Sequence, residues 1–384
     1  MAYEKISIIV PIYYGKRYID AMIRQVEMCR RFLANHYIVE LILINDAPND
    51  MLDAYASGTI EVIVLNTNVN RGIQGARIRG LSVCHGEYVL FLDQDDKIAP
   101  EYLASQIKCI QGYDASVCRA IHEKKQFYNE TLRFEKAISF EHMLKEGDGI
   151  VSPGQVLMKK SAISELWKNN ILQNNGADDW FLWLCMMKEG KRFALNQEVL
   201  FEHVVDGANT SWNTEKMLQS ELEVCEVLGR TGNFSADEVA TLENTVQKVK
   251  EKHLKTLNHF KQMFFIYDKW MSLESQKRMI SSYLKCKNYN KVAIYGGGYL
   301  GKQLLTNLKR DNVEVCYIID RNAKYLEAEV DLYTLEEELP YVDVAIITLL
   351  SKEDEIKSQL MHKLGSNALS IKELLELLEK ESND

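Results

Sequence analysis

Two aspartates that could hold a metal ion follow an apolar run in the segment FLDQDD at positions 91–96. In an extended backbone, side chains two residues apart point to the same side, so Asp93 and Asp95 would present two carboxylates together. Such a pair suits a hard divalent cation, Mg²⁺ or Mn²⁺, that keeps positions open for phosphate oxygens. The alternative is an ordinary polar strand end in which Asp96 caps a helix from Ile98 onward. Because the motif is short, its surroundings must decide between the two.

A glycine-containing segment upstream, NVNRGIQGARIRGL (68–81), has residue types that bind phosphate. Asn70 and Gly72 precede a predicted helix that carries Arg77. Glycine lets backbone amides approach a phosphate, and an arginine adds a charge-assisted clamp. We therefore predict that these residues bind the diphosphate of a nucleotide donor. A glycine loop with surface arginines is the alternative.

Two other predicted strands end in residues that suit a nucleobase. Pro11 and Tyr13 close the first apolar run, and Asp46 follows the second. An aromatic ring can stack on a base while a carboxylate accepts its N–H groups. Asp46 is equally suited to forming a turn, because the residues APND follow it.

A pair of aspartates opens a predicted helix in the segment GADDWFLWL (176–184), in which Trp180 and Trp183 have the spacing of core residues. Asp178 and Asp179 are favoured there by the helix dipole alone. The functional interpretation is a general base. Successive helical residues point about 100° apart, so only one of the two carboxylates can reach a reacting hydroxyl, and we assign Asp179.

The elements that must position these residues are predicted to form an α/β fold. Short runs rich in Val, Ile and Leu alternate with amphipathic stretches, and the runs are KISIIVPIY (5–13), IVELILIN (38–45), EVIVLN (61–66) and EYVLFLD (87–93). Near-continuous apolar strands of this kind indicate a parallel sheet covered on both faces. In such sheets the ligand site lies at the carboxyl ends of the strands, where the polar residues above are found.

The composition of the chain excludes some classes of protein. A formal net charge of −9 over 384 residues argues against nucleic-acid binding. The eight cysteines include no C-x-x-C pair, which indicates reduced thiols in a cytoplasmic protein. No apolar run approaches the roughly 18–20 residues of a membrane span, and no signal segment precedes the first strand pattern. We therefore expect a cytoplasmic enzyme, with peripheral contact to the inner face of a membrane as an option.

The chain divides into three predicted pieces: a domain over residues 1–212, a helical region over 213–288, and a small α/β domain over 289–384. Between Lys248 and Lys291 the helical region has eleven Lys or Arg against three acidic residues, with several aromatics among them. Two interpretations fit. The segment is an interfacial helix that docks on anionic lipid, or its aromatics form a buried seam between two domains.

The motifs of the first 212 residues together resemble glycosyltransferase family 2, in order and in spacing. The matching segments are IIVPIY, INDAPND, N-x-G-x-x-x-A-R (70–77), FLDQDD and DDW (178–180). The resemblance implies a GT-A fold and an inverting transferase, with a UDP-sugar donor and Mg²⁺ or Mn²⁺. It further implies that Asp46 binds the base, Asp93 lies near the ribose and metal, Asp95 binds the metal and Asp179 is the catalytic base. The transferred sugar would be a hexose or N-acetylhexosamine, and the acceptor a glycan or lipid-linked glycan in bacterial surface polysaccharide synthesis.

The chain departs from the family pattern at three places. The Asn common after the first-strand Tyr is Tyr14 here, and Ala47-Pro48 stands where the family has Gly-Ser. Many members have a His before an N-x-S segment, a position that Asp206 fills in this chain, with His203 three residues earlier. His203 is therefore a candidate for contact with diphosphate or metal, or a buried structural histidine.

A second nucleotide motif begins the last piece of the chain. Gly296, Gly298 and Gly301 form a G-x-G-x-x-G between a predicted strand and helix, and Asp320 follows where a ribose hydroxyl would bind. The module resembles a truncated Rossmann domain. Its alternatives are an NAD(P)-dependent NDP-sugar oxidoreductase or epimerase and a non-catalytic scaffold for homo-oligomerisation or regulation, and we favour the scaffold.

Overall fold

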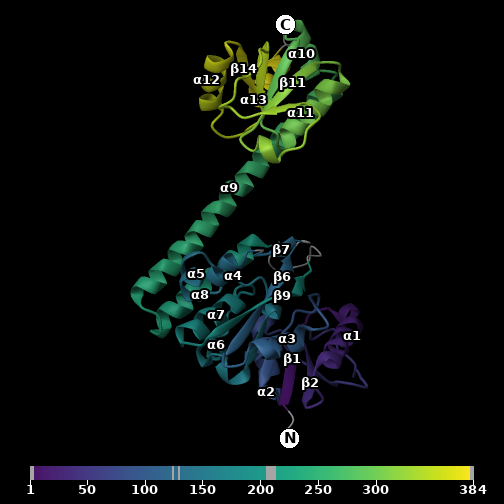
Figure 1. Cartoon of the computed structure of the whole chain (residues 1–384), viewed down its shortest axis with the longest axis vertical. Helices are drawn as coiled ribbons and strands as arrows, with labels where there is room; N and C mark the ends of the chain where they lie inside the picture. Colours follow the sequence, from purple (N-terminus) through teal and green to yellow (C-terminus); the bar gives the residue numbers. More distant parts are fainter. Residues whose placement is uncertain (1–3, 123–124, 129, 205–212, 381–384) are drawn as a thin grey trace. The chain divides into compact units, whose positions relative to one another are not determined.

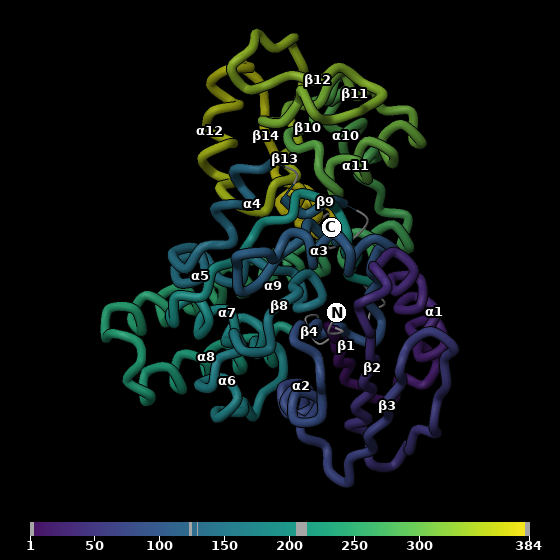
Figure 2. The backbone as a smooth tube through the Cα atoms, turned by 60° about the horizontal axis from the view of Figure 1, so that its bottom comes forward, coloured from purple at the N-terminus to yellow at the C-terminus, as the bar shows by residue number. Residues whose placement is uncertain are grey.

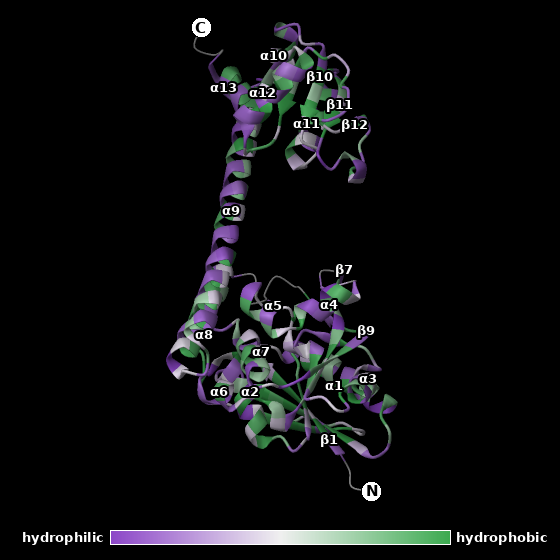
Figure 3. Cartoon of the chain, turned by 60° about the vertical axis from the view of Figure 1, so that its left-hand side comes forward, coloured by the Kyte–Doolittle hydropathy of each residue, from purple (hydrophilic) through white to green (hydrophobic). Residues whose placement is uncertain are grey.

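A computed structural model describes residues 4–122, 125–128, 130–204 and 213–380 of the chain (Figure 1). Its contacts divide the chain into two compact units, Met1–Glu251 and Lys252–Asp384. Each unit contains its own sheet, whose strands are marked as hydrophobic in Figure 3. No helix in the described ranges is both long enough and apolar enough to cross a bilayer.

The sheet of the first unit is mixed, with a parallel half and a half that contains antiparallel pairs. Its order is β3-β2-β1-β4-β8-β6-β9-β5, and β7 pairs with β6. The four apolar runs form adjacent parallel strands, as the sequence predicts. The strands are β1 (Glu4–Ile12), β2 (Tyr37–Asn45), β3 (Glu61–Asn66), β4 (Tyr88–Phe91), β5 (Lys97–Ile98), β6 (Ala115–His122), β7 (Lys125–Phe127), β8 (Val156–Lys159) and β9 (Phe193–His203).

Helices cover both faces of this sheet, which explains why its strands are apolar at consecutive positions (Figure 2). Ile8 and Ile9 are neighbours on β1, yet they belong to two different core clusters because alternate side chains point to opposite faces. One cluster includes residues of α1 (Lys16–Phe32) and α3 (Tyr102–Cys109). The other is built around α2 (Gly72–Val83), α4 (Thr131–Ala137), α5 (Phe140–Lys145), α6 (Glu165–Asn169) and α7 (Asp178–Lys188).

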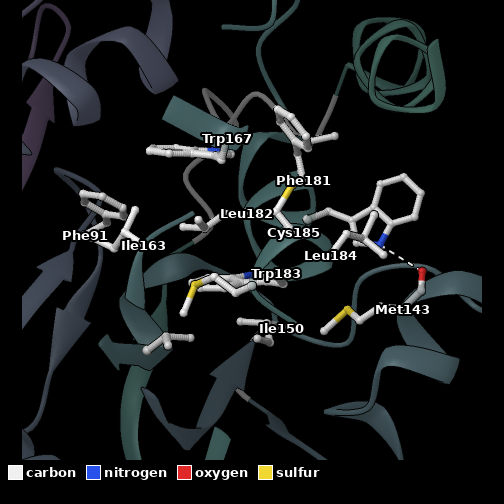
Figure 4. Packing of buried hydrophobic residues seen from close by; sticks show 14 of the residues in the cluster. Phe91, Met143, Ile150, Ile163, Trp167, Phe181, Leu182, Trp183, Leu184 and Cys185 are labelled. Atoms are coloured by element: carbon white, nitrogen blue, oxygen red, sulfur yellow. Dashed lines mark hydrogen bonds between the residues drawn. The ribbon is translucent and has the colours of Figure 1, made fainter. Parts of the chain in front are cut away.

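The core beside α7 is unusually aromatic, and it fixes the position of the DDW segment. Trp167, Phe181 and Trp183 are all buried, and they lie together with Phe91 at the end of β4 (Figure 4). The indole of Trp180 donates to the Met143 carbonyl at 3.0 Å. Packing of these aromatic side chains on the buried side of α7 therefore holds the start of the helix in place.

The local structure around FLDQDD differs from the sequence prediction. β4 ends at Phe91, so Asp93 and Asp95 lie in the turn that follows the strand and not in extended backbone. The helix from Ile98 that belonged to the alternative interpretation does not form there, because Lys97 and Ile98 pair with β9 as the short strand β5, and α3 begins at Tyr102. Pairing with a strand a hundred residues away overrides the local helix signal.

Two helices that follow the expected boundary at residue 212 pack on the first unit. α8 (Thr214–Thr231) buries Val224 and Leu228 in the core beside α7. α9 (Ala236–Ser275) starts in the same core through Leu242 and Val246, and continues past Glu251 into the second unit. The sequence placed these helices outside the first domain because they lack the alternating strand pattern.

The second unit has a five-stranded parallel sheet in the order β12-β11-β10-β13-β14. Numbered along the chain this order is 3-2-1-4-5, the order of the doubly wound α/β folds. The strands are β10 (Lys291–Tyr295), β11 (Glu314–Ile319), β12 (Asp331–Tyr333), β13 (Val344–Ile347) and β14 (Asn367–Ser370). The helices of this unit after α9 are α10 (Ile280–Cys286), α11 (Tyr299–Arg310), α12 (Glu353–Leu364) and α13 (Ile371–Lys380).

Candidate functional site

A cavity of about 930 Å³ lies in the first unit, where β1, β2 and β4 end and α2 and α7 begin. All of the residues predicted for the donor, the metal and the base line it, although they come from segments far apart in the chain. They are Pro11, Tyr13, Asp46, Asn70, Gly72, Arg77, Asp93, Asp95, Asp179 and His203. The structure thus brings them to one site, and their individual roles remain predictions.

Arg77 is the buried centre of this site. Only 2% of its surface is exposed, and its two terminal nitrogens are engaged by carboxylates from two different segments. Nη2 donates to Oδ1 of Asp93 at 2.7 Å, and Nη1 donates to Oδ2 of Asp178 at 2.6 Å. Burial opposes its charge, but Asp178 and Asp93 outweigh that effect and raise the pKa of Arg77. Arg77 therefore joins the FLDQDD turn to the start of α7, and its contact with a donor phosphate stays a prediction.

We expect Arg77→Met to lower the free energy of unfolding by about 3–5 kcal/mol, because it leaves Asp178 buried without its cation. The measurement is urea denaturation of the full chain. The matched control is Arg79→Met on the same helix, which is exposed and should change stability by less than about 0.5 kcal/mol. Equal stability of the two variants would contradict the structural role assigned to Arg77.

The paired aspartates at the start of α7 have different surroundings. Asp178 is buried against Arg77, whereas Asp179 is partly exposed and lines the cavity. Oδ1 of Asp179 accepts from the Trp180 backbone N–H at 2.9 Å. Burial and the neighbouring charge of Asp178 raise the pKa of Asp179 to about 7. A carboxylate with a pKa near neutrality is suited to accept a proton from a hydroxyl.

Asp96, the third aspartate of FLDQDD, is a structural residue. Its Oδ1 lies 2.9 Å from Nδ1 of His203 and accepts the Val204 backbone N–H at 3.1 Å. Its Oδ2 accepts from the Ser152 hydroxyl at 2.9 Å. Asp96 therefore ties the turn to the end of β9.

His203 combines structural contacts with a place in the cavity wall. Its ring stacks on that of His122, with the centroids 5.2 Å apart, while Nδ1 faces Asp96. Burial lowers the pKa of His203, but the contact with Asp96 and the nearby Asp93 and Asp95 outweigh this and raise it. Asp206, the other residue compared with the family histidine, lies outside the described residues.

The carboxylates of the turn can hold a divalent cation only together with other ligands. Within the described ranges, no group of three or more His, Cys, Asp or Glu is arranged to hold a metal ion. One oxygen of Asp93 is bound to Arg77, and both oxygens of Asp96 are engaged within the protein. Asp95 lines the cavity beside them. Mg²⁺ is commonly held by one or two carboxylates and completed by substrate phosphates and water. The donor set fits that mode and does not fit a site made by protein alone.

The glycine segment before α2 is held by side-chain carbonyls and carboxylates. Asp46 Oδ1 accepts the Arg71 N–H at 2.8 Å, Asn70 Oδ1 accepts the Gly72 N–H at 2.9 Å, and Asn175 Oδ1 accepts the Ile73 N–H at 3.1 Å. Gly72 has φ +73, and a Cβ there would lie 2.5 Å from the Asn175 oxygen. Glycine is needed here for a close approach between two loops.

Asp46 is therefore a buried residue that holds a loop, and burial raises its pKa. The turn-forming role considered for it belongs to its neighbour, because Asn45 Oδ1 accepts the Ala47 N–H at 3.1 Å. Asp46 still lines the cavity, so its role toward a nucleobase stays a prediction.

Tyr13 is linked to the FLDQDD turn through Gln94. The Tyr13 N–H donates to Oε1 of Gln94 at 3.0 Å, and Nε2 of Gln94 donates back to the Tyr13 carbonyl at 3.3 Å. The next residue, Tyr14, has φ 49, a left-handed conformation that asparagine enters more easily than tyrosine. The Tyr13 ring is exposed beside the cavity, which suits it to stacking on a planar ligand.

Several residues that line the cavity were missed by the sequence analysis. Asp148 stands between two glycines, a local signal that could have been noticed, whereas Arg17 and Lys216 have no local signal. Glu221 is on α8, beyond the predicted end of the domain. Burial raises its pKa to about 7, and its buried Oε2 has no hydrogen-bond partner in the described part of the chain.

Comparison with known proteins identifies the segment that contains this turn. The model of the family "Glycosyl transferase family 2" matches residues 7–167. Residues 7–167 belong to glycosyl transferase family 2. The family 2 segment includes Asp46, Arg77, Asp93 and Asp95, and it ends before Asp179.

Relatives of the family 2 segment are glycosyltransferases of bacteria. The chain is 31% identical over 119 residues to glycosyltransferase GlyG of Streptococcus pneumoniae, covering 30% of this chain and 38% of that protein. It is 32% identical over 108 residues to a poly(ribitol-phosphate) beta-glucosyltransferase of Bacillus spizizenii, covering 26% of this chain and 16% of the relative. The matched region spans between 16% and 40% of the length of the curated relatives.

Solved structures with a similar chain path include Staphylococcus aureus TarS 1–349 in complex with UDP-GlcNAc. The sequences are 15% identical, the TM-score is 0.46, and the match covers 63% of this chain and 71% of that one.

In the second unit, the glycine motif is explained largely by packing. Gly296 has φ +104, and a Cβ on Gly301 would lie 1.9 Å from the Gly296 carbonyl oxygen. Asp320 Oδ2 accepts the Gly297 N–H at 2.7 Å, and Oδ1 accepts the Asn322 N–H at 2.8 Å. Asp320 thus closes its own loop, and a second nucleotide site with Gly296, Gly298, Gly301 and Asp320 stays a prediction.

Proposed function

We propose that the chain is an inverting glycosyltransferase that moves a sugar from a UDP-sugar to a hydroxyl of a glycan or lipid-linked glycan. The observation that carries the proposal is the lining of one cavity by the Asp93–Asp95 turn of a family 2 segment and by Asp179. We further propose a place in bacterial surface polysaccharide synthesis, in keeping with the poly(ribitol-phosphate) beta-glucosyltransferase among the relatives. None of the eight cysteines is in a disulfide, which supports the cytoplasm as its location.

The chemistry of the proposal needs a base on one side of the sugar and a stabilised leaving group on the other. Asp179 accepts the proton of the attacking hydroxyl, which a pKa of about 7 favours. Asp95 and Asp93 would hold Mg²⁺ or Mn²⁺, which neutralises charge on the departing diphosphate. Arg77 holds Asp93 and Asp178 in place, so the turn and α7 keep their spacing. A single displacement inverts the anomeric centre.

The acceptor in this proposal presents neutral hydroxyls to the base. Asp179, Asp148 and Glu221 all line the cavity, and carboxyl groups accept hydrogen bonds from hydroxyl groups. Arg17 and Lys216 are cations in the same cavity wall and suit the phosphates of the donor. The carboxyl groups around Asp179 therefore suit an acceptor whose reacting end presents hydroxyls.

The test is a screen of the purified full chain against UDP-, GDP- and dTDP-sugars with Mn²⁺, measuring the nucleotide released. We expect hydrolysis or transfer with a UDP-sugar, and faster release when a glycan acceptor is added. Failure of every nucleotide sugar to bind or react would contradict the proposal.

For the second unit we propose a scaffold role in place of an oxidoreductase or epimerase. The support is the engagement of both Asp320 oxygens by backbone amides of its own unit. Fluorescence titration of the full chain with NAD and NADP tests this, and saturable binding would favour the oxidoreductase.

A further inference from the structure

α9 has a stripe of exposed residues along the part of the helix that belongs to the second unit. The spacing is three and four residues in turn, which keeps the side chains on one face of a helix. The members, which we call the α9 stripe, are Leu254, Leu257, Lys261, Phe264, Asp268 and Met271. Phe264 is 66% exposed and Met271 is 70% exposed. Figure 3 shows α9 as mostly hydrophilic, with hydrophobic stretches along it.

The stripe is not the face by which α9 packs on its own unit. Ile266, Trp270 and Leu273 of the same helix are buried in the core of the second unit. Phe260 and Phe265, which flank the stripe, are exposed as well. Six exposed apolar side chains lie within 18 residues of one helix, and a concentration of exposed apolar side chains marks an interaction surface.

Two opposite charges lie inside the stripe and decide what can cover it. Lys261 and Asp268 are one heptad apart, both are exposed, and neither takes part in an ion pair within the described ranges. A carboxylate between two apolar members of the stripe, as Asp268 is between Phe264 and Met271, is unfavourable against lipid, particularly an anionic one. Against another protein helix, by contrast, the carboxylate can form an ion pair with a basic side chain. The charges therefore favour a protein helix over a lipid surface, which was one of the two interpretations from the sequence. The other, a buried aromatic seam, does not hold for Phe260, Phe264 and Phe265, which are exposed.

The order of the charges selects a second copy in antiparallel orientation. A parallel pair in register would set each Lys261 against its own equivalent, and likewise each Asp268. In an antiparallel pair, Leu254 of one copy can lie opposite Met271 of the other. In this register, Asp268 of one copy is offset from Lys261 of the other by four residues, which is about 6 Å along the helix axis. An extended lysine side chain spans that offset. In a two-fold symmetric dimer the contact between Lys261 and Asp268 forms twice.

We propose that the α9 stripe is a self-association surface on which a second copy docks antiparallel, with Lys261 of each copy paired to Asp268 of the other. The proposal is independent of the transferase activity. It identifies a specific route to the homo-oligomer that the sequence left open.

The experiment is sedimentation equilibrium of the full chain over a wide range of concentration. We expect a dimer whose Kd rises on the order of tenfold or more in Lys261→Glu and in Asp268→Lys, because each change creates two like-charge contacts. The double variant Lys261→Glu/Asp268→Lys restores the wild-type Kd, since it exchanges the charges without losing the pairs. Lys255→Glu, on another face of α9, is the matched control and leaves the Kd unchanged.

A second variant tests the apolar part of the stripe. Phe264→Ser should be monomeric with an unchanged circular dichroism spectrum, because Phe264 is exposed within its own chain. The proposal is overturned if the wild-type chain is monomeric throughout, if the single charge reversals leave the dimer unchanged, or if the double variant fails to restore it. Sedimentation of a monomeric chain with phosphatidylglycerol vesicles at low salt would overturn it in favour of lipid.

Discussion

Asp179→Asn is expected to reduce sugar transfer by about 10³-fold and to leave the Kd for the nucleotide sugar unchanged. The reason is that a general base acts on the attacking hydroxyl in the transition state, whereas the ground-state donor does not need it. The amide keeps the shape of the carboxylate and can still accept the Trp180 N–H. The measurements are kcat by nucleotide release and donor Kd by calorimetry.

Asp178→Asn is the matched control at the neighbouring position. Asp178 is buried against Arg77, so its loss leaves a buried guanidinium with one carboxylate in place of two. We expect this variant to lose stability in urea. If Asp178→Asn instead kept its stability and donor binding but lost transfer, while Asp179→Asn stayed active, the assignment within the pair would be wrong.

The pH dependence checks the same carboxylate by a separate route. Because burial and the charge of Asp178 raise the pKa of Asp179 to about 7, kcat should rise with pH through about 7 and then level off. The pKa of Asp179 in the folded state lies above its unfolded value of about 3.9. Protonated Asp179 therefore favours folding at low pH, and this contribution to stability is lost as pH rises toward 7. Asp179→Asn should therefore gain stability relative to the wild type above pH 7.

Asp95→Ala is expected to lower kcat/KM on the order of 10³-fold and to abolish the dependence of activity on Mn²⁺. Asp93 and Asp95 are the two proposed protein ligands of the cation and both line the cavity, so the loss of Asp95 removes a large share of the protein ligands. Mn²⁺ binding followed by electron paramagnetic resonance gives a readout that does not need activity.

In that assay we expect Mn²⁺ to bind the wild-type chain weakly alone and more tightly with UDP, because the diphosphate completes the coordination. Asp95→Ala should lose the UDP-enhanced binding, with circular dichroism unchanged. Full activity in excess EDTA would remove the metal from the mechanism.

The strands and the cavity position could be predicted because their signals are local. Apolar runs such as 38–45 form buried strands whatever surrounds them, and glycine and aspartate mark the loops that follow. In a parallel arrangement the polar ends of such strands must meet at one edge. The residues predicted for donor, metal and base therefore line the same cavity.

The errors in the prediction have a common physical cause. Asp93 and Asp95 were expected in extended backbone, but they lie in a turn that leads to Lys97 and Ile98, which pair with β9. α8 and the start of α9 were expected in a separate helical region, but their apolar faces pack beside α7. A periodic pattern shows that a helix buries one face, but it does not show which part of the protein that face packs against.

The sequence by itself determined the α/β class, the family resemblance and the set of residues that meet in the cavity. Only the tertiary structure decided which of them are engaged with one another: Arg77 with Asp178, which is 101 residues away, and Asp96 with His203. It also showed that Glu221 reaches the cavity and that the α9 stripe is left uncovered within its unit. Propensity and periodicity act over a few neighbouring residues, whereas pKa, ion pairing and exposure depend on groups that only folding brings together.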